Sequence, residues 1–195
     1  APVALDPSIV RIKAVDTTID ELSPNVNYGD EPYLSVKGNT EVALVKFDLS
    51  VLNGRSYNKA TLVINSLLNE EADESAAHVT VGVLPQAGDW NEGLLTWTDA
   101  GSSRAGSFVV NQFQSDSSQT RRHEVDVLRA VENALRPSFQ GGAPSRIVTF
   151  ELYTEPGSIA QFASREWNGG ALEPELRIHL SDNPSVSQLV FLILI

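Results

Sequence analysis

Short apolar runs broken by Gly, Pro, Asn and Asp are the feature of this sequence that most limits its fold. Within the runs, apolar side chains either alternate with polar ones or belong to β-branched residues, and both patterns are typical of β-strands. The runs predict strands at residues 9–15, 33–36, 42–47, 60–64, 78–84, 123–127, 147–152 and 176–180. Many short strands with turn residues between them indicate an all-β fold, a jelly-roll β-sandwich.

One short helix is expected between two of these strands. Apolar residues recur at helical spacing from Val127 to Leu135, and Pro137 ends the pattern because proline cannot continue a helix. We expect this helix to cover one end of the sandwich. With 195 residues the chain has the size of one domain and can bury a core without disulfides.

The charge and the cysteine content exclude several classes of function. The net charge of −11 argues against nucleic acid and anionic membranes as partners, because both favour clustered Lys and Arg. The chain has no cysteine, which excludes disulfides, thiol chemistry and Cys-ligated zinc. It begins at Ala1 and contains no methionine, so we expect a secreted, extracellular or cell-surface chain whose signal peptide has been removed. Trimming of an expressed fragment is the alternative.

An uncharged apolar run closes the sequence. Its residues are Leu189, Val190, Phe191, Leu192, Ile193, Leu194 and Ile195. The run is too short for a membrane-spanning helix, which needs roughly 20 apolar residues, but it suits a β-strand. Such a strand has to be buried in its own sandwich, in another copy or in a partner, because a free apolar edge leads to aggregation. We therefore divide the chain into a jelly-roll module at 1–180, a linker at 181–185 and an extra C-terminal apolar strand at 186–195.

Motifs of known catalytic sites are missing from the sequence. It contains no nucleophile elbow, phosphate loop, HExxH zinc motif or dinucleotide-binding glycine motif. The three histidines fall on separate predicted strands, so we expect exposed histidines in place of a zinc triad. Asp89 and Glu92 flank Trp90, and a carboxylate pair of this kind could serve a polysaccharide-active enzyme, which is a distant alternative. We expect a protein that is not an enzyme.

Several short motifs occur in an order that resembles a known family. They are Asp16-Thr17-Thr18-Ile19, Asn27-Tyr28-Gly29, Val45 to Ser50, Lys59-Ala60-Thr61-Leu62, Trp90-Asn91-Glu92, Val125-Asp126-Val127-Leu128 and Pro174-Glu175-Leu176-Arg177-Ile178. Together they resemble the DNRLRE-type β-sandwich modules, also classed as carbohydrate-binding module family 96, from about Ile9 to Leu180. Two departures stand out. Asp99-Ala100-Gly101 replaces the proline that usually follows the Thr-Trp motif, and the run 189–195 lies beyond the end of such a module.

The resemblance implies a non-catalytic, extracellular jelly-roll module of the kind often attached to polysaccharide-degrading enzymes. Sugar binding needs an exposed aromatic ring that stacks on a pyranose and polar groups that bind its hydroxyls. Trp97 alternates with its neighbours in the segment 94–98, which places it in the core. The candidates for carbohydrate stacking are Trp167, Tyr28, Tyr33, Trp90 and Arg165. The alternative for Trp167 is a hydrophobic plug over the end of the sandwich.

Acidic and amide side chains crowd into the region around residues 16–30. The candidates for calcium ligands are Asp16, Asp20, Asn27 and Asp30. Their oxygen atoms suit calcium, but the spacing of an EF-hand is missing and charge clusters are usually solvated surface. A structural calcium ion is therefore left open, and no cofactor is required.

Two functions remain open at this level. In the first, the protein is a non-catalytic structural subunit of an extracellular filament, and its strand 189–195 completes the sandwich of the next copy. Such a head-to-tail contact with itself produces a fibre or a ring. In the second, the protein is a carbohydrate-binding or adhesive module that recognises an extracellular polysaccharide. Neither function involves nucleic acid or a membrane span.

Overall fold

The computed structural model describes residues 6–68, 77–84, 88–104, 106–115, 119–136 and 145–181. Within these ranges the chain forms a β-sandwich of eleven antiparallel strands, so the predicted all-β fold is confirmed. The strands are β1 (Ile9–Lys13), β2 (Val15–Asp20), β3 (Tyr33–Lys37), β4 (Glu41–Asp48), β5 (Tyr57–Ser66), β6 (Ala77–Val83), β7 (Phe108–Ser115), β8 (Arg121–Asp126), β9 (Ile147–Thr154), β10 (Ile159–Ala163) and β11 (Glu175–Leu180).

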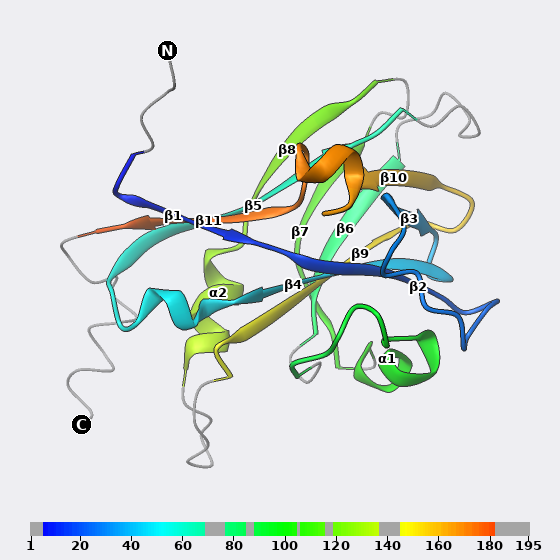
Figure 1. Cartoon of the computed structure of the whole chain (residues 1–195), viewed down its shortest axis with the longest axis horizontal. Helices are drawn as coiled ribbons and strands as arrows, with labels where there is room; N and C mark the ends of the chain where they lie inside the picture. Colours follow the sequence, from blue (N-terminus) through cyan, green and yellow to red (C-terminus); the bar gives the residue numbers. More distant parts are fainter. Residues whose placement is uncertain are drawn as a thin grey trace.

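The strands form two layers that face each other across the core (Figure 1). One layer holds β1, β11, β5 and β8, and β10 and β3 continue it beside β5. The other layer holds β2, β4, β9, β6 and β7 in that order. Hydrogen bonding continues from one layer to the other at a corner, where Lys37 of β3 pairs with Glu41 of β4. The result is a continuous antiparallel network folded back on itself.

The first predicted strand, 9–15, is two strands in the structure. β1 pairs with β11 in one layer, whereas β2 pairs with β4 in the other. Ala14 between them is buried, and its N–H donates to the carbonyl oxygen of Pro174 at 3.3 Å. The chain therefore crosses between the layers at Ala14, which brings the end of β2 beside β3.

The main core lies between the layers, and a second apolar cluster covers the outer face of the β2–β4 layer. In the main core the rings of Phe47 and Phe150 meet edge to face, with centroids 6.1 Å apart. Val42 and Leu44 of β4 point the other way and pack in the second cluster with Trp90. β4 is therefore buried on both faces, which explains why its sequence is almost continuously apolar.

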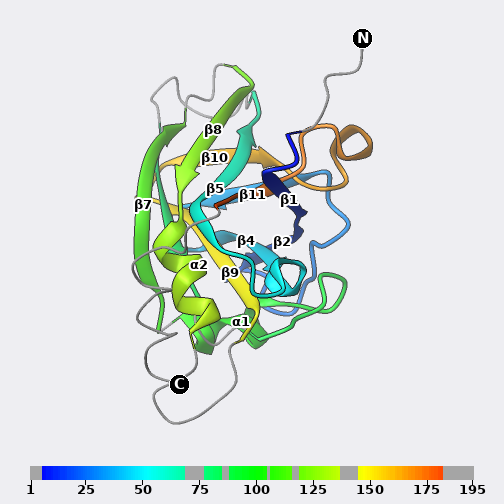
Figure 2. The same ribbon diagram turned by 90° about the vertical axis from the view of Figure 1, so that its left-hand side faces the viewer.

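Two α-helices are found in the described part of the chain, whereas the sequence predicts one. The predicted helix is α2 (Leu128–Leu135), which packs against β5 and β9 (Figure 2). The second, α1 (Trp97–Arg104), begins where the alternation at 94–98 suggests extended chain. The N–H and the hydroxyl of Thr96 both donate to Oδ2 of Asp99, at 3.2 and 2.8 Å. This capping pair favours a helix start and outweighs the alternating pattern.

The proposed division of the chain beyond residue 180 is not tested by the structure. Ser181 is the last described residue, so the rest of the linker and the apolar strand 186–195 lie outside the described residues. The seven apolar residues from Leu189 to Ile195 therefore remain a predicted assembly strand. None of the helices in the described ranges is long and apolar enough to cross a membrane.

Candidate functional site

A hollow of about 290 Å³ lies beside β3 and β10. These two strands contribute Tyr33, Ser35, Lys37, Ile159 and Gln161 to its lining. The strands β2 and β4 and the loop at 21–32 add Thr18, Asp20, Tyr28, Glu31 and Glu41. We call this hollow the tyrosine groove, because two of the predicted stacking candidates, Tyr28 and Tyr33, line it together.

Strand pairing builds the floor of the tyrosine groove. Leu34 and Val36 of β3 turn into the core, so the alternate residues of β3 face outward. The antiparallel register places Gln161 of β10 directly opposite Ser35 of β3. The N–H of Ser35 also donates to the hydroxyl of Thr18 at 2.9 Å, which fixes β3 against β2. The outward side chains are thus held on a rigid sheet.

Asn27 positions the loop that carries Tyr28. The side-chain amide nitrogen of Asn27 donates to the carbonyl oxygens of Glu92 and Leu95, the latter at 2.7 Å. Its side-chain oxygen accepts the N–H of Gly29 at 3.1 Å. The side-chain nitrogen of Asn27 therefore joins the loop to the segment before α1, while its oxygen closes a turn within the loop around Tyr28.

Gly29 allows the close approach of these two segments. A Cβ atom at this position would lie 2.3 Å from the carbonyl oxygen of Glu92, a separation that no side chain can adopt. On the other side of the loop, the hydroxyl of Ser164 donates to the carbonyl oxygen of Glu31 at 2.7 Å. The loop is therefore held at both ends, and the Tyr28 ring has a defined place at the groove.

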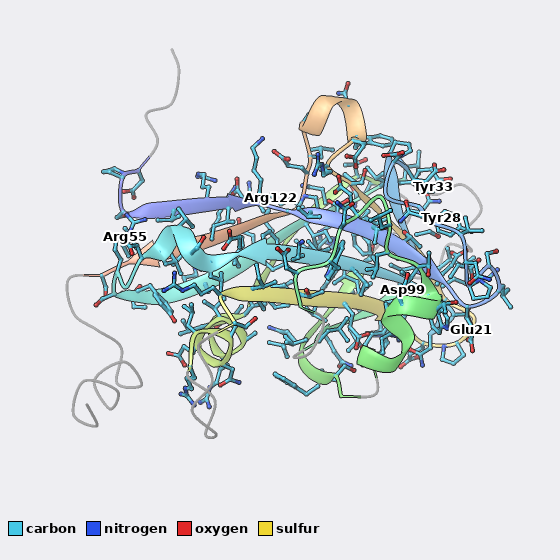
Figure 3. All side chains as sticks on the ribbon, turned by 60° about the horizontal axis from the view of Figure 1, so that its bottom comes forward. Glu21, Tyr28, Tyr33, Arg55, Asp99 and Arg122 are labelled. Carbon is cyan, nitrogen blue, oxygen red and sulfur yellow. The ribbon has the colours of Figure 1, made fainter. Side chains whose placement is uncertain are left out.

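Five side chains of the groove are available to a ligand. Tyr28, Glu31, Tyr33, Lys37 and Gln161 make no side-chain hydrogen bond or ion pair within the described ranges. Tyr33 is 38% exposed, and Figure 3 shows it at the same end of the sandwich as Tyr28. Two aromatic rings with unengaged amide, ammonium and carboxylate groups beside them can both stack on a ring and bind its polar substituents.

A second, more open hollow of about 360 Å³ differs because its polar groups already have partners. Nζ of Lys46 bonds Asp89 at 2.6 Å, and Arg165 bonds Glu92 at 2.9 Å. The indole N–H of Trp90 donates to the hydroxyl of Thr149 at 3.1 Å. These pairs tie β4, β9 and the segment at 89–92 together, so we assign this hollow a structural role.

A buried carboxyl group, that of Asp16, and a partly buried one, that of Glu166, lie close together next to the start of η2, a 3-10 helix (Trp167–Gly170). Burial and the nearby carboxyl of Glu166 raise the pKa of Asp16 to about 7. The N–H of Arg165 donates to Oδ2 of Asp16 at 3.1 Å, and this hydrogen bond acts in the opposite direction by lowering that pKa. Burial also raises the pKa of Glu166. Oδ1 of Asp16 and Oε2 of Glu166 are buried without a hydrogen-bond partner in the described part of the chain. Protonation therefore relieves unfavourable charge at this point of the fold.

The remaining stacking candidates lie outside the tyrosine groove. Trp90 is only 8% exposed and packs in the second apolar cluster, so its ring faces the interior. Trp167 is half-buried on η2 and does not line the groove. Arg165 is ion-paired with Glu92 and Glu166. Lys37 and Gln161 were missed by the sequence analysis, although their outward alternation on short strands was the available signal.

The calcium candidates are not gathered into one site. Asn27 is fully used in holding the loop, and Oδ1 of Asp20 accepts the N–H of Leu22 at 2.9 Å. Asp16 is buried beside Arg165, whereas Asp30 is exposed. In the described ranges no three His, Asp or Glu side chains come together in a way that could hold a metal ion.

Comparison with known families agrees with the fold and the motifs. The family described as carbohydrate-binding module family 96 matches residues 8–179, which is most of the chain. The chain belongs to this family. The predicted resemblance is therefore confirmed, and the tyrosine groove lies wholly inside the matched part of this family 96 module. None of the curated proteins matches the module.

Two solved structures show a distant likeness to the family 96 module. One is the Clostridium thermocellum endo-1,4-β-D-xylanase 10B, with its CBM22-1 and GH10 modules complexed with xylohexaose. It is 9% identical over 89% of this chain, with a TM-score of 0.32, and this chain spans only 30% of that one. The other is the naturally occurring empty particle of cowpea mosaic virus, at 12% identity, 94% and 86% coverage of the two chains, and a TM-score of 0.33.

Proposed function

We propose that this family 96 module binds a polysaccharide in the tyrosine groove and has no catalytic role. The observation that supports this most is the meeting of Tyr28 and Tyr33 in one hollow with Lys37 and Gln161. Tyrosine rings stack on the apolar face of a pyranose, while amide, ammonium and carboxylate groups bind its hydroxyls. The groove sits on two paired strands and a doubly anchored loop, so it needs little reorganisation to bind.

The size and place of the groove fit a short stretch of a longer chain. Its volume of about 290 Å³ is at the lower end of the range for ligand pockets, roughly 300 Å³ upward. A hollow that is open at the surface leaves the rest of the polymer in solvent. We therefore propose that the module attaches to an extracellular polysaccharide through a few sugar units at a time.

The filament that the sequence predicts is not part of this proposal. Its assembly strand, Leu189 to Ile195, lies outside the described residues, and no comparison supports self-assembly. Strand donation therefore stays a prediction from the sequence alone, and it is compatible with a groove that binds glycans.

Binding to a panel of soluble and insoluble polysaccharides tests the proposed function, by retention in affinity gels and by depletion from solution. Tyr33→Ala and Tyr28→Ala should each weaken binding about tenfold, which corresponds to about 1.4 kcal/mol of lost contact. Trp167→Ala removes an aromatic ring outside the groove and is the matched control. If Trp167→Ala abolishes binding while Tyr33→Ala does not, the binding site lies at η2, and its assignment to the tyrosine groove is wrong.

A further inference from the structure

We infer that the apolar run 189–195 adds as a further strand to the free edge of β7 in its own molecule. β7 is the last strand of its layer, with β6 on one side and no described strand on the other (Figure 2). The N–H of Gln112 donates to the side-chain oxygen of Asn111 at 2.8 Å, a local bond that an added strand would replace. The main chain of β7 can therefore accept a strand by edge pairing.

The side chains of β7 differ from those of other edge strands in this sandwich. Edge strands are usually protected by charged side chains, which discourage pairing with another segment. β1 and β8, at the edges of the other layer, each carry at least two charged residues. The stretch 106–115 has no charged residue and no proline, and its one protective feature is a register shift opposite Gly82. Phe108 and Val109 are 41% and 55% exposed, so β7 presents an uncharged and partly apolar edge.

A hollow of about 550 Å³ lies between β7 and α2. The stretch 108–111 lines it on one side, and Leu128, Ala130 and Asn133 line it on the other. Asp126 and Arg129 add one charge of each sign to the lining. The side chains of a strand alternate between its two faces, so one set of side chains of an added strand can pack in this hollow and cover Phe108.

The described chain ends within reach of this hollow. The N–H of Ser181 donates to the carbonyl oxygen of Ser56, next to the start of β5, at 3.0 Å. Asp126 pairs with Thr61 of β5, and five steps along a strand separate Thr61 from Ser56, about 17 Å. The stretch 182–188 can span up to roughly 25 Å when it is extended, so it can carry the run 189–195 to β7.

The run 189–195 matches β7 in length and in character. As a strand it is about 23 Å long, against about 26 Å for β7, and it is uncharged and apolar throughout. Because the run is tethered to the sandwich, its effective concentration at β7 is in the millimolar range, which favours its own molecule over a second copy. The inference goes beyond the proposed function, since β7 does not line the tyrosine groove and pairing there leaves the groove open.

Thiol crosslinking of the full chain tests this pairing, and the chain has no cysteine that would interfere. Gln112→Cys with Leu192→Cys places one thiol near the middle of each strand, and a short bismaleimide should join them within one molecule at any protein concentration. Asn58→Cys with Leu192→Cys is the matched control. Asn58 is exposed on β5 close to Ser56, so a run that is tethered without docking would reach it easily. The yield should be at least about fivefold higher for the Gln112 pair, because docking raises the local concentration of the thiol.

Hydrogen exchange of the full chain gives a second readout. Leu192→Asp places a charge in the middle of the run and should release it from β7. The β7 amides that face away from β6 should then exchange at least about tenfold faster than in the wild type. The amides of β1, which is also an edge strand, are the internal control and should not change.

Two results would overturn the inference. Crosslinked dimers, in a yield that grows with protein concentration, would show that the run pairs with another copy instead of its own molecule. Equal yields for the two cysteine pairs, together with β7 amides that do not respond to Leu192→Asp, would show that β7 is not the acceptor. Neither result affects the proposed function, because glycan binding is measured separately with the tyrosine variants.

Discussion

The side-chain amide of Asn27 donates to the carbonyl oxygen of Leu95 at 2.7 Å, across 68 positions of sequence. Through this bond and its partner to Glu92, the loop that carries Tyr28 is anchored to the segment before α1. Asn27→Ala leaves both carbonyl groups without this donor, so it should lower the free energy of unfolding by about 1–3 kcal/mol. Chemical denaturation measures this loss.

Asn27→Ala should also weaken glycan binding several-fold, because Tyr28 loses its fixed place. Asn58→Ala, on the exposed side of β5, is the matched control and should change neither quantity. A variant that loses stability but binds glycan with the wild-type affinity would show that Tyr28 is not part of the site.

Gly29 and Gly93 offer a comparison of two glycines at the same junction. A Cβ atom at position 29 would lie 2.3 Å from the carbonyl oxygen of Glu92, whereas at position 93 the nearest atom would be 3.5 Å away, an ordinary contact. Gly29→Ala should therefore destabilise the protein by roughly 1–3 kcal/mol and reduce glycan affinity. Thermal unfolding of the two variants is the measurement, and equal midpoints for Gly29→Ala and Gly93→Ala would contradict the close approach described above.

A buried ion pair holds α1 on the β-sandwich. Nε of Arg104 lies 2.9 Å from Oε2 of Glu151, whose side chain is 1% exposed. The guanidinium also lies over the ring of Trp97, 5.0 Å from its centroid. Arg104→Met leaves a buried carboxylate without its partner and should cost about 3–5 kcal/mol of stability.

The double variant Arg104→Met with Glu151→Met removes both charges and should recover most of that loss. Urea denaturation of the two single variants and the double variant gives the coupling energy. Additive losses in the three variants would mean that the pair contributes nothing as a pair.

Asp16 and His123 should give opposite dependences of stability on pH. The raised pKa of Asp16, about 7 against an ordinary 3.8, means that the folded protein keeps a proton which the unfolded chain has released. This group therefore lowers the free energy of unfolding as the pH rises from about 4 to about 7. Burial lowers the pKa of His123 from 6.5 to about 4, so this group lowers the free energy of unfolding as the pH falls through that window.

Single substitutions separate these two contributions. Asp16→Asn keeps an acceptor for the N–H of Arg165, and its stability should rise with pH between about 4.5 and 7 more steeply than that of the wild type. For His123→Gln, the free energy of unfolding should instead fall as the pH rises through this window, relative to the wild type, since only the carboxyl contribution of Asp16 remains. Each contribution amounts to at most a few kcal/mol, because one unit of pKa corresponds to about 1.4 kcal/mol. Identical slopes for both variants would contradict the assignments.

Sequence patterns were sufficient to predict the strands in the central part of the fold. β4 and β9 were expected at 42–47 and 147–152 and are found at Glu41–Asp48 and Ile147–Thr154, because buried strands carry continuous apolar and β-branched residues. β7 was missed, since most of its side chains are exposed or partly exposed and its pattern is correspondingly weak. α1 was missed because its start depends on the Thr96–Asp99 pair more than on apolar spacing.

The candidate site was predictable only in part. Tyr28 and Tyr33 are close in sequence and were identified as stacking candidates, but Gln161 joins them only through the antiparallel pairing of β3 with β10. Sequence alone cannot fix a register between segments that lie so far apart in the chain. Trp167 lies on η2 outside the groove, and no local pattern of the sequence reveals how η2 packs.

The most direct test of the tyrosine groove is a titration of the isotope-labelled protein with an oligosaccharide of the polysaccharide that it binds, followed at the backbone amides by nuclear magnetic resonance. The account predicts that the largest shifts fall on Tyr28, Tyr33, Ser35 and Gln161, and that Tyr33→Ala removes them. Shifts confined to η2 around Trp167, or to Asp89 and Asn91 at the second hollow, with the β3 and β10 amides unchanged, would contradict it.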